Sequence, residues 1–521
     1  MSKQIKQTKK EMEKEWLKKA EINYGKEIKT NPDDAEAHIS LGNVLVKLDK
    51  FEEAEKEYEK ALELNPKLEI PPDNYGRLLW KLGRPEEAEK ELKKAIEINP
   101  DDEYSHNGLG VVFFKYNQLS AAEREYRKAI EINPNHEYAH NNLGNVLKKL
   151  GKYKESEEEF KKAIEINPRD RYAHSSYGSL LCELERYDEA EKKFKKAIGI
   201  NPKDMYVHNG LGFLLRKSER FEEAEKEFRK AIEINPENSY AHGSLGILLD
   251  ISGKYEEAEK EYRKAIEIYP GDAGSHVNLG WLLYNLKRYD EAEIEYRETL
   301  KINPENVCAH NNLGLLLYEL ERYEEADKEY KKVLELDPKH SNAHNNLGNL
   351  LSELEKPDEA EKEYIEAIRA NPKDAIPHYN LGNLLRELNR FDEAEREYRK
   401  AVKINPEYAY AHNNLALLLE DLKRYDEAEK EYLRLIEIKP DDPETYYKLG
   451  NFLAGLKKYF QAEKEYKKAI EINPEYAEAH RNLGTVYSKT KRNRWAKKEF
   501  QIAIELFKNQ GREEDAMDVK N

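Results

Sequence analysis

The sequence has few of the residues from which secreted, metal-binding and membrane proteins are built. Cys182 and Cys308 are its only cysteines in 521 residues, and neither stands in a recognisable motif. A disulfide framework is therefore excluded, and a zinc site is disfavoured. No run of eighteen apolar residues occurs, and the first residues, Met1 to Lys6, lack the apolar core of a signal peptide. We therefore expect no membrane span and a soluble, cytoplasmic protein.

Catalytic signatures are missing as well. Gly-x-Gly occurs at Gly108 and at Gly210, but neither copy follows a strand pattern or has a third glycine, so neither predicts a phosphate-binding loop. There is no Gly-Lys-Ser/Thr, no Gly-x-Ser-x-Gly and no cysteine in a nucleophile's setting. Glutamate pairs such as Glu55 and Glu59 alternate with lysines, which is typical of solvated helix faces. We expect no enzyme, no catalytic residue, no cofactor and no metal.

The charge balance also restricts the class of partner. The net charge is −16, with both signs mixed along the chain, which disfavours nucleic acid or an anionic membrane as the partner of the whole protein. With 37% charged residues the composition could suggest disorder, yet the apolar residues fall at helical spacing. We therefore expect a folded helical protein.

What the sequence does contain is a repeat. A proline recurs at a constant step of 34 residues, at Pro32, Pro66, Pro100, Pro134, Pro168, Pro202, Pro236, Pro270, Pro304, Pro338, Pro372, Pro406, Pro440 and Pro474. A fixed period of this length indicates a solenoid in which each unit packs only on its neighbours.

Other residues keep the same step. Counting the first residue of each unit as position 1, the unit that begins at Ala375 has these repeated residues: His378, Leu381, Gly382, Ala394, Tyr398, Ala401 and Pro406. This pattern resembles the tetratricopeptide repeat (TPR) family. The resemblance implies an all-α fold, a right-handed α-solenoid superhelix of 34-residue helix-turn-helix units.

We divide the chain accordingly. Residues 35–510 form fourteen tandem TPR units, residues 1–34 an N-terminal capping helix equal to half a repeat, and residues 511–521 a short C-terminal tail. In the capping helix, an apolar stripe is predicted at Trp16, Ala20, Tyr24 and Ile28. In the tail, Met517 falls at the next unit's leucine position.

Each unit should contain helix A, at about positions 1–14, and helix B, at about positions 18–31. Glycine at position 8 and alanine at position 20 permit close packing of the two helices, and the aromatic residue at position 24 fills the adjoining gap. Position 4 is usually histidine: His38, His106, His140, His174, His208, His242, His276, His310, His344, His378, His412 and His480. Equivalent positions on successive helices lie roughly 8–10 Å apart, too far for one metal ion to bridge, so we interpret these histidines as packing residues.

The resemblance also implies that positions 2, 5, 6, 9, 12 and 13 of helix A face a concave groove where partners bind. Position 6 carries a row of asparagines: Asn74, Asn142, Asn278, Asn312, Asn346, Asn380, Asn414 and Asn482. A primary amide can bond the backbone of an extended peptide of any sequence. The row is similar to that in the TPR superhelix of O-linked N-acetylglucosamine transferases, without a catalytic domain following it. The alternative, that these amides bond a neighbouring helix, has equal weight.

The other groove columns change along the chain. The early units carry tyrosine at position 2 and basic residues at positions 12 and 13: Tyr104, Tyr138, Tyr172, Tyr206, Tyr240, Lys115, Lys149 and Arg216. The middle is apolar and includes Trp281, and the later units are acidic from Glu319 to Asp421. Such a groove would orient a peptide whose charges run the opposite way. Tyrosine with lysine also resembles a platform for single-stranded nucleic acid, but the acidic second half disfavours that ligand.

The family resemblance implies a scaffold or adaptor that binds extended or disordered segments of other proteins, without chemistry of its own. Two alternatives remain open. The chain could be the substrate-recruiting subunit of an enzyme made on a separate chain, such as a glycosyltransferase, or it could associate with copies of itself.

Overall fold

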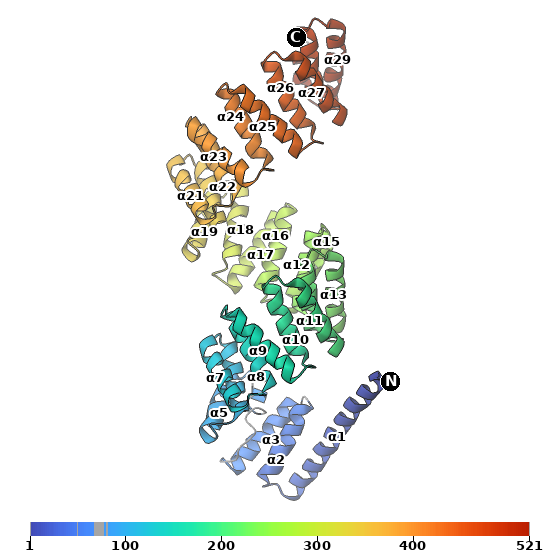
Figure 1. Ribbon diagram of the computed structural model, residues 1–521, viewed down its shortest axis with the longest axis vertical. Coiled ribbons are helices and arrows are strands. Elements are labelled where there is room, and N and C mark those ends of the chain that lie inside the picture. The colour runs from blue at the N-terminus through green and yellow to red at the C-terminus, as the bar shows by residue number, and fades with distance from the viewer. Residues whose placement is uncertain (1, 49, 67–74, 76–77, 80–81, 520–521) are drawn as a thin grey trace. The chain divides into compact units, whose positions relative to one another are not determined.

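The computed structural model describes the backbone of residues 2–48, 50–66, 75, 78–79 and 82–519, and their side chains except those of 2–15 and 47 (Figure 1). Within these residues the chain is a succession of helices joined by short turns. The A helices that begin the repeats are α2 (Ala35–Lys47), α6 (Glu103–Lys115), α8 (Glu137–Lys149), α10 (Arg171–Glu183), α12 (Met205–Lys217), α14 (Ser239–Ile251), α16 (Ala273–Asn285), α18 (Val307–Glu319), α20 (Ser341–Glu353), α22 (Ala375–Glu387), α24 (Ala409–Asp421), α26 (Pro443–Gly455) and α28 (Ala477–Lys489).

The B helices follow them at a constant interval. They are α3 (Phe51–Leu64), α5 (Pro85–Ile98), α7 (Leu119–Ile132), α9 (Tyr153–Ile166), α11 (Tyr187–Ile200), α13 (Phe221–Ile234), α15 (Tyr255–Ile268), α17 (Tyr289–Ile302), α19 (Tyr323–Leu336), α21 (Pro357–Ala370), α23 (Phe391–Ile404), α25 (Tyr425–Ile438), α27 (Tyr459–Ile472) and α29 (Asn493–Asn509). Helix A thus occupies positions 1–13 and, in every described repeat but the last, helix B occupies positions 17–30, within one residue of the predicted bounds. The predicted all-α solenoid of helix-turn-helix units is confirmed.

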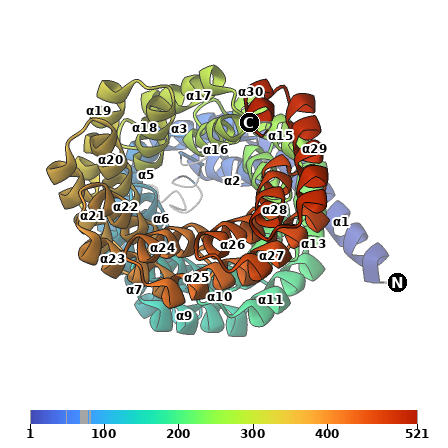
Figure 2. The same cartoon turned by 90° about the horizontal axis from the view of Figure 1, so that it is seen from above.

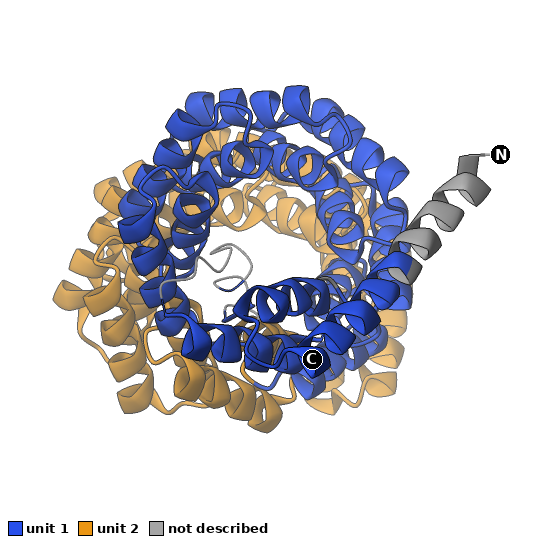
Figure 3. Cartoon of the chain, turned by 90° about the horizontal axis from the view of Figure 1, so that it is seen from below, with its two compact units in different colours: residues 1–270 blue, residues 271–521 orange. Residues whose placement is uncertain are grey.

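The chain comprises two compact units, residues 1–270 and residues 271–521. In the second, the A helices from α16 to α28 line the inner side of a curved array, and the B helices from α17 to α29 form its outer side (Figure 2). The first unit is a curved array of the same helix pairs (Figure 3). Helix A of each repeat in the second unit therefore belongs to the inner layer, and the first unit repeats the same pairing of helix A with helix B.

Each repeat folds for local reasons. The Asp374 carboxylate accepts the Ile376 N–H at 2.9 Å and caps the start of α22. Helix α23 ends at Ile404 because Asn405 precedes Pro406, which pushes residue 405 out of the α region to an extended conformation. The turns and caps thus set the helix bounds, while packing of the two helices stabilises the pair.

The close crossing of helices A and B depends on glycine at position 8. A Cβ atom built on Gly382 would lie 2.7 Å from the Tyr398 ring, and one on Gly314 the same distance from the Tyr330 ring. Ala394 and Ala401, on the facing side of α23, are fully buried. The predicted packing role of the small residues and of the aromatic residue at position 24 is confirmed.

The ends of the chain depart from the repeat, and one prediction made there was wrong. Helix α1 (Ser2–Thr30) packs on α2 through half-buried Tyr24 and Ile28, but Trp16 is 63% exposed and its neighbour Leu17 is buried instead. In α30 (Glu513–Asp518), Met517 is 55% exposed and Ala516 is buried. The repeat pattern comes from interior helices, which pack on a neighbouring repeat on each side. The first and last helices pack on a repeat on one side only, so their buried positions differ from the pattern.

The last B helix is also longer than the others. Helix α29 has 17 residues, whereas α27 has 14, because Lys508 stands where the other repeats have proline and can continue the hydrogen-bond ladder. None of the described helices combines the length and the apolar character needed to cross a bilayer.

Candidate functional site

The position-4 histidines are buried packing residues, and most of them make two polar contacts. Nδ1 lies 2.5–2.8 Å from the glutamate at position 23 of the same repeat, and Nε2 lies 2.9–3.2 Å from the carbonyl oxygen of the preceding repeat's proline. Both contacts are made by His38, His106, His140, His208, His242, His310, His344, His412 and His480. The interpretation of these histidines as packing residues is confirmed. Their hydrogen bonds also connect helix B of the same repeat with the end of the preceding repeat.

In His208, His242 and His344, an acceptor faces each ring nitrogen, so the geometry favours the imidazolium form. For His208, the hydrogen bond to Glu227 raises the pKa above its ordinary value even though burial opposes this. Burial alone would raise the pKa of Glu227, but the hydrogen bonds from His208 and Lys230 hold it below its ordinary value. These charges neutralise each other inside the repeat and are therefore not a ligand site.

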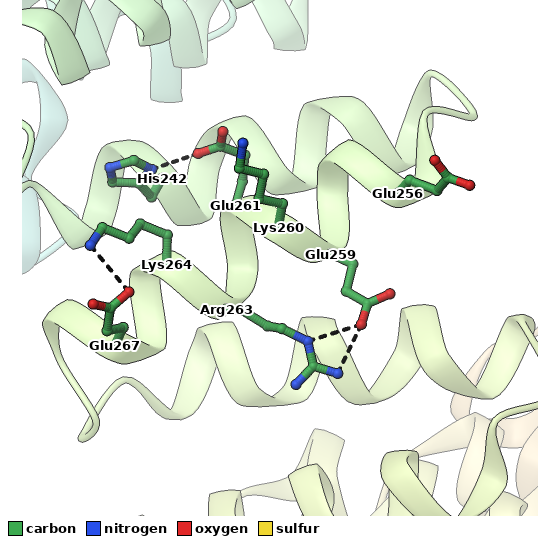
Figure 4. Close-up of a pocket in the computed structure, with 8 residues that line it drawn as sticks. All are labelled: His242, Glu256, Glu259, Lys260, Glu261, Arg263, Lys264 and Glu267. Atoms are coloured by element: carbon green, nitrogen blue, oxygen red, sulfur yellow. Dashed lines mark hydrogen bonds and ion pairs between the residues drawn. The ribbon is translucent and has the colours of Figure 1, made fainter.

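The outer layer shows the same internal neutralisation. A hollow of about 660 Å³ lies between His242 and α15 (Figure 4). Around it His242 bonds Glu261 at 2.5 Å, Arg263 bonds Glu259 at 2.9 Å and Lys264 bonds Glu267 at 3.1 Å. Within the described part of the chain, no group of three or more His, Cys, Asp or Glu residues has the arrangement of a metal site.

The asparagines at position 6 bond the preceding A helix. The Nδ2 of Asn380 donates to Oδ1 of Asn345 at 2.9 Å and to Oδ1 of Asn349 at 3.1 Å. Equivalent bonds to the preceding repeat are made by Asn142, Asn346, Asn414 and Asn482. In these residues the amide nitrogen links neighbouring helices, as the second interpretation of the asparagine row predicts. Asn74 lies outside the described residues.

The amide oxygens differ from the nitrogens. Oδ1 of Asn312, Asn414 and Asn482 accepts a bond from the adjacent side chain of its own helix. For Asn142, Asn346 and Asn380, no hydrogen bond within the described residues engages Oδ1, although each residue is half-buried. Available acceptors therefore remain on α8 of the first unit and on the adjacent helices α20 and α22 of the second. Asn278 is half-buried and has no side-chain hydrogen bond to another described residue.

The tyrosines at position 2 are the most exposed aromatic row. Tyr104, Tyr138, Tyr172, Tyr206 and Tyr240 are 49–69% exposed, on five successive A helices of the first unit. Burying such large rings in water-free contact with a partner would be favourable, and their hydroxyl groups can bond the same partner. The row is a surface that the fold of the isolated chain leaves uncovered.

Cations accompany this row. Lys149 Nζ lies 4.6 Å from the centre of the Phe114 ring, and Arg216 lies 5.2 Å from that of Phe213, while Lys115 is exposed on the same layer. In the second unit, Trp281 is 39% exposed and stacks on Tyr284 at 5.5 Å. Also in that unit, desolvation raises the pKa of Glu420, as expected for a half-buried acid without a cationic partner.

Two features escaped the sequence reasoning. His136 and His340 lie outside position 4 and cap α8 and α20, where Nδ1 accepts the N–H of Ala139 at 3.2 Å and of Ala343 at 3.1 Å. Their place two residues after a repeat proline, where other units have aspartate or asparagine, was the available signal. The second feature is a cavity beside α12, whose lining residues come from three repeats.

Comparisons with known proteins agree with the repeat pattern. Family models described as tetratricopeptide repeat or TPR repeat match residues 35–68, 76–117, 112–151, 137–170, 173–204, 204–271, 251–306, 305–373, 345–405, 379–443 and 453–491. No curated protein sequence matches the chain.

Among solved structures, the chain is similar to one described as the APC/C hetero-tetramer Cut9-Hcn1 and to the yeast Tom70. The first match has 14% identity and a TM-score of 0.46, and it covers 88% of this chain and 97% of that one. The second has 16% identity and a TM-score of 0.42, and it covers 82% of this chain and 96% of that one.

Proposed function

Since this chain belongs to the tetratricopeptide repeat family, in which helical arrays act as protein-interaction scaffolds, we propose that its inner layer binds extended segments of other proteins. In this proposal the chain is an adaptor that holds its partner without chemistry. The exposed tyrosine row on α6, α8, α10, α12 and α14 is the observation that carries the proposal, because it gathers uncovered aromatic surface on one layer.

The asparagine oxygens support the same proposal. A segment in extended conformation presents backbone N–H groups, and the unengaged Oδ1 atoms of Asn142, Asn346 and Asn380 can accept from them. Each contact is weak, so affinity would come from many contacts along the array. On the outer helix α15, by contrast, Glu261 bonds His242 of α14, Arg263 bonds Glu259 and Lys264 bonds Glu267 (Figure 4).

Peptide binding by two matched variants tests the proposal. In the first, Tyr138, Tyr172 and Tyr206 are changed to serine on the inner layer. In the second, Tyr153 and Tyr255, which are exposed at the starts of the outer helices α9 and α15, are changed to serine. Wild type and both variants are applied to an array of extended peptides, and circular dichroism verifies that all three are folded.

We expect the inner-layer variant to lose most of the peptides that wild type binds and the outer-layer variant to retain them. Equal loss in both variants, or binding unaffected by the inner-layer changes, would contradict the proposal. Chemical cross-linking of a bound peptide, followed by mass spectrometry, gives an independent location, with cross-links expected on helices α6 to α14.

A further inference from the structure

The last two repeats of the second unit differ from the others at the start of helix B. Positions 18 and 19, which are acidic in most other repeats, are Phe460 and Gln461 in one of them and Arg494 and Trp495 in the next. Position 21, which is acidic in all thirteen preceding repeats, is Lys497. The first turns of α27 and α29 therefore carry no acidic residue.

The result is a local excess of positive charge in a chain whose net charge is −16. Residues 489–498 include six basic residues and no acidic one. Two glutamates of the same helices are already engaged, since Glu463 pairs with Arg492 at 2.6 Å and Glu499 with His480 at 2.6 Å. Within the described residues, no carboxylate pairs with the other five basic side chains, which are all exposed: Lys489, Lys491, Arg494, Lys497 and Lys498.

Two large apolar rings lie beside these cations. Phe460 is 78% exposed, the highest value for a large apolar side chain among the described residues, and Trp495 is 56% exposed. The Arg492 guanidinium lies 5.7 Å from the centre of the Phe460 ring and 4.5 Å from that of Tyr487. The Tyr487 ring in turn lies 6.2 Å from the Trp495 ring, so the two exposed rings belong to one surface.

We call this surface the basic patch, which comprises the two exposed rings, Arg492 and the five unpaired cations. One exposed ring on a protein surface is ordinary. Two rings that are joined through an arginine and surrounded by cations indicate an interaction site. Because the cations are unpaired, the complementary partner is anionic.

The rings decide which anionic partner fits. Single-stranded nucleic acid follows a positively charged groove and stacks its bases on ring faces. Here the Arg492 guanidinium lies over the Phe460 ring, and helix α29 lies on the outer side of the array (Figure 2). A carboxylate-rich protein segment would pair with the cations but leave both rings in water. A lipid interface meets both needs, because its headgroups supply phosphates and its acyl boundary accepts phenylalanine and tryptophan.

We infer that the basic patch adsorbs to an anionic phospholipid surface, with Phe460 and Trp495 inserted at the headgroup boundary and the cations against the lipid phosphates. The inference goes beyond the proposed function, since it adds attachment to a membrane surface to a protein-binding scaffold. The net charge of −16 does not oppose it at contact, because charges farther than about 8 Å away are largely screened at physiological ionic strength.

The experiment measures co-sedimentation of the full chain with two kinds of vesicle. One contains phosphatidylcholine alone, and the other contains in addition about 30% phosphatidylserine. We expect at least about 100-fold tighter binding to the second, because each cation near an anionic surface contributes about fivefold. Binding should weaken as the salt concentration rises.

Tryptophan fluorescence locates the contact. Phosphatidylserine vesicles with brominated acyl chains should quench the emission of wild type, because Trp495 reaches the acyl boundary. Trp495→Phe keeps an apolar ring, so it should bind within about threefold of wild type but lose this quenching.

Matched variants separate the patch from the net charge. Arg494→Asp with Lys497→Glu restores the acids of the other repeats and should weaken binding at least about 25-fold. Phe460→Ser with Trp495→Ser should weaken it about tenfold or more. Lys362→Glu with Lys430→Glu makes the same charge change at exposed residues of the outer helices α21 and α25 and should alter binding by less than about threefold. Circular dichroism verifies that all variants are folded.

Absence of adsorption, equal binding to both kinds of vesicle, or equal weakening by the Lys362 and Lys430 changes would overturn the inference. So would binding of a single-stranded oligonucleotide or of polyglutamate without vesicle binding, which would assign the patch to nucleic acid or to an acidic protein segment. Peptide binding by the tyrosine row is measured separately with the peptide array, and either result can fail while the other holds.

Discussion

Nδ1 of His208 lies 2.6 Å from Oε2 of Glu227, and Nε2 of the same ring lies 3.1 Å from the carbonyl oxygen of Pro202. The ring therefore bonds helix α13 of its own repeat and the turn that ends the preceding one. Because both partners are acceptors, a neutral ring can satisfy only one of them. The junction between the two repeats is thus coupled to protonation of one buried histidine.

This coupling predicts that stability falls at alkaline pH. The pKa of His208, His242 and His344 is raised above the ordinary value of 6.5, first through the hydrogen bond to the paired glutamate. A raised pKa stabilises the fold fully below the unfolded value, and this stabilisation is lost as pH rises through the folded value. The melting temperature should therefore decrease as pH rises above 6.5.

The paired acids set the lower limit of this range. Despite burial, hydrogen bonds from His208 and Lys230 lower the pKa of Glu227 below 4.5, so its contribution is present above that value and is lost as pH falls through the lowered one. Calorimetry across about pH 2.5 to 9 on wild type and on a variant combining His208→Gln, Glu227→Gln, His242→Gln and Glu261→Gln tests both limits. Identical dependence of the melting temperature on pH in the two proteins would show that the histidine–glutamate pairs do not set these pH limits.

The repeat at His174 provides a natural exception. Its position 23 is Lys193, Nδ1 of His174 has no partner among the described residues, and burial lowers the pKa of this histidine. Lys193→Glu should create the missing pair and raise the pKa of His174 above its ordinary value. The variant loses the contact of Lys193 with the Tyr177 ring at 4.7 Å, so we expect a net stabilisation of about 1 kcal/mol at pH 6.

Denaturant unfolding at pH 6 and pH 8.5 measures this effect, and the gain should be smaller at the higher pH. Lys203→Glu makes the same charge change at an exposed residue that does not face the ring and should have little effect at either pH. Equal stabilisation by both variants would mean that net charge, and not the buried pair, is responsible.

How much of the structure could be predicted from the sequence depends on how local each interaction is. Proline, Leu-Gly and alanine recur because each repeat has the same internal packing, so the interior helices could be predicted to within a residue. Trp16 was misplaced because helix α1 packs on α2 alone, so its buried face differs from that of an interior helix. The bond from Asn380 to Asn345 could not be predicted from position 5 alone, since it depends on position 6 of the next repeat.

The turn between helices A and B offers a second test of stability. Position 15 adopts the left-handed conformation, with φ of 60° at Lys287 and 74° at Gly253. A side chain costs about 1–2 kcal/mol in this conformation, partly offset by the greater flexibility of glycine in the unfolded chain. Lys287→Gly should therefore stabilise the protein by about 0.5–1 kcal/mol, and Gly253→Lys should destabilise it similarly. Thermal unfolding of the two variants measures the expected gain and the expected loss of stability. Destabilisation by Lys287→Gly would contradict the prediction.

The asparagine row allows packing and binding to be separated. Removing the Asn380 amide leaves the buried Oδ1 of Asn345 without its donor, so Asn380→Ala should destabilise the protein by about 1–3 kcal/mol. For Asn278, the residue at position 5 of the preceding repeat is Gly243, which has no side chain to accept such a bond. Asn278→Ala should therefore change stability by less than about 0.5 kcal/mol. A double-mutant cycle of Asn345→Ala with Asn380→Ala isolates the pair, and additive effects would show that the bond contributes nothing. If Asn278→Ala keeps its stability but weakens peptide binding, the row contacts the partner directly, because at this residue no helix-to-helix bond has been removed.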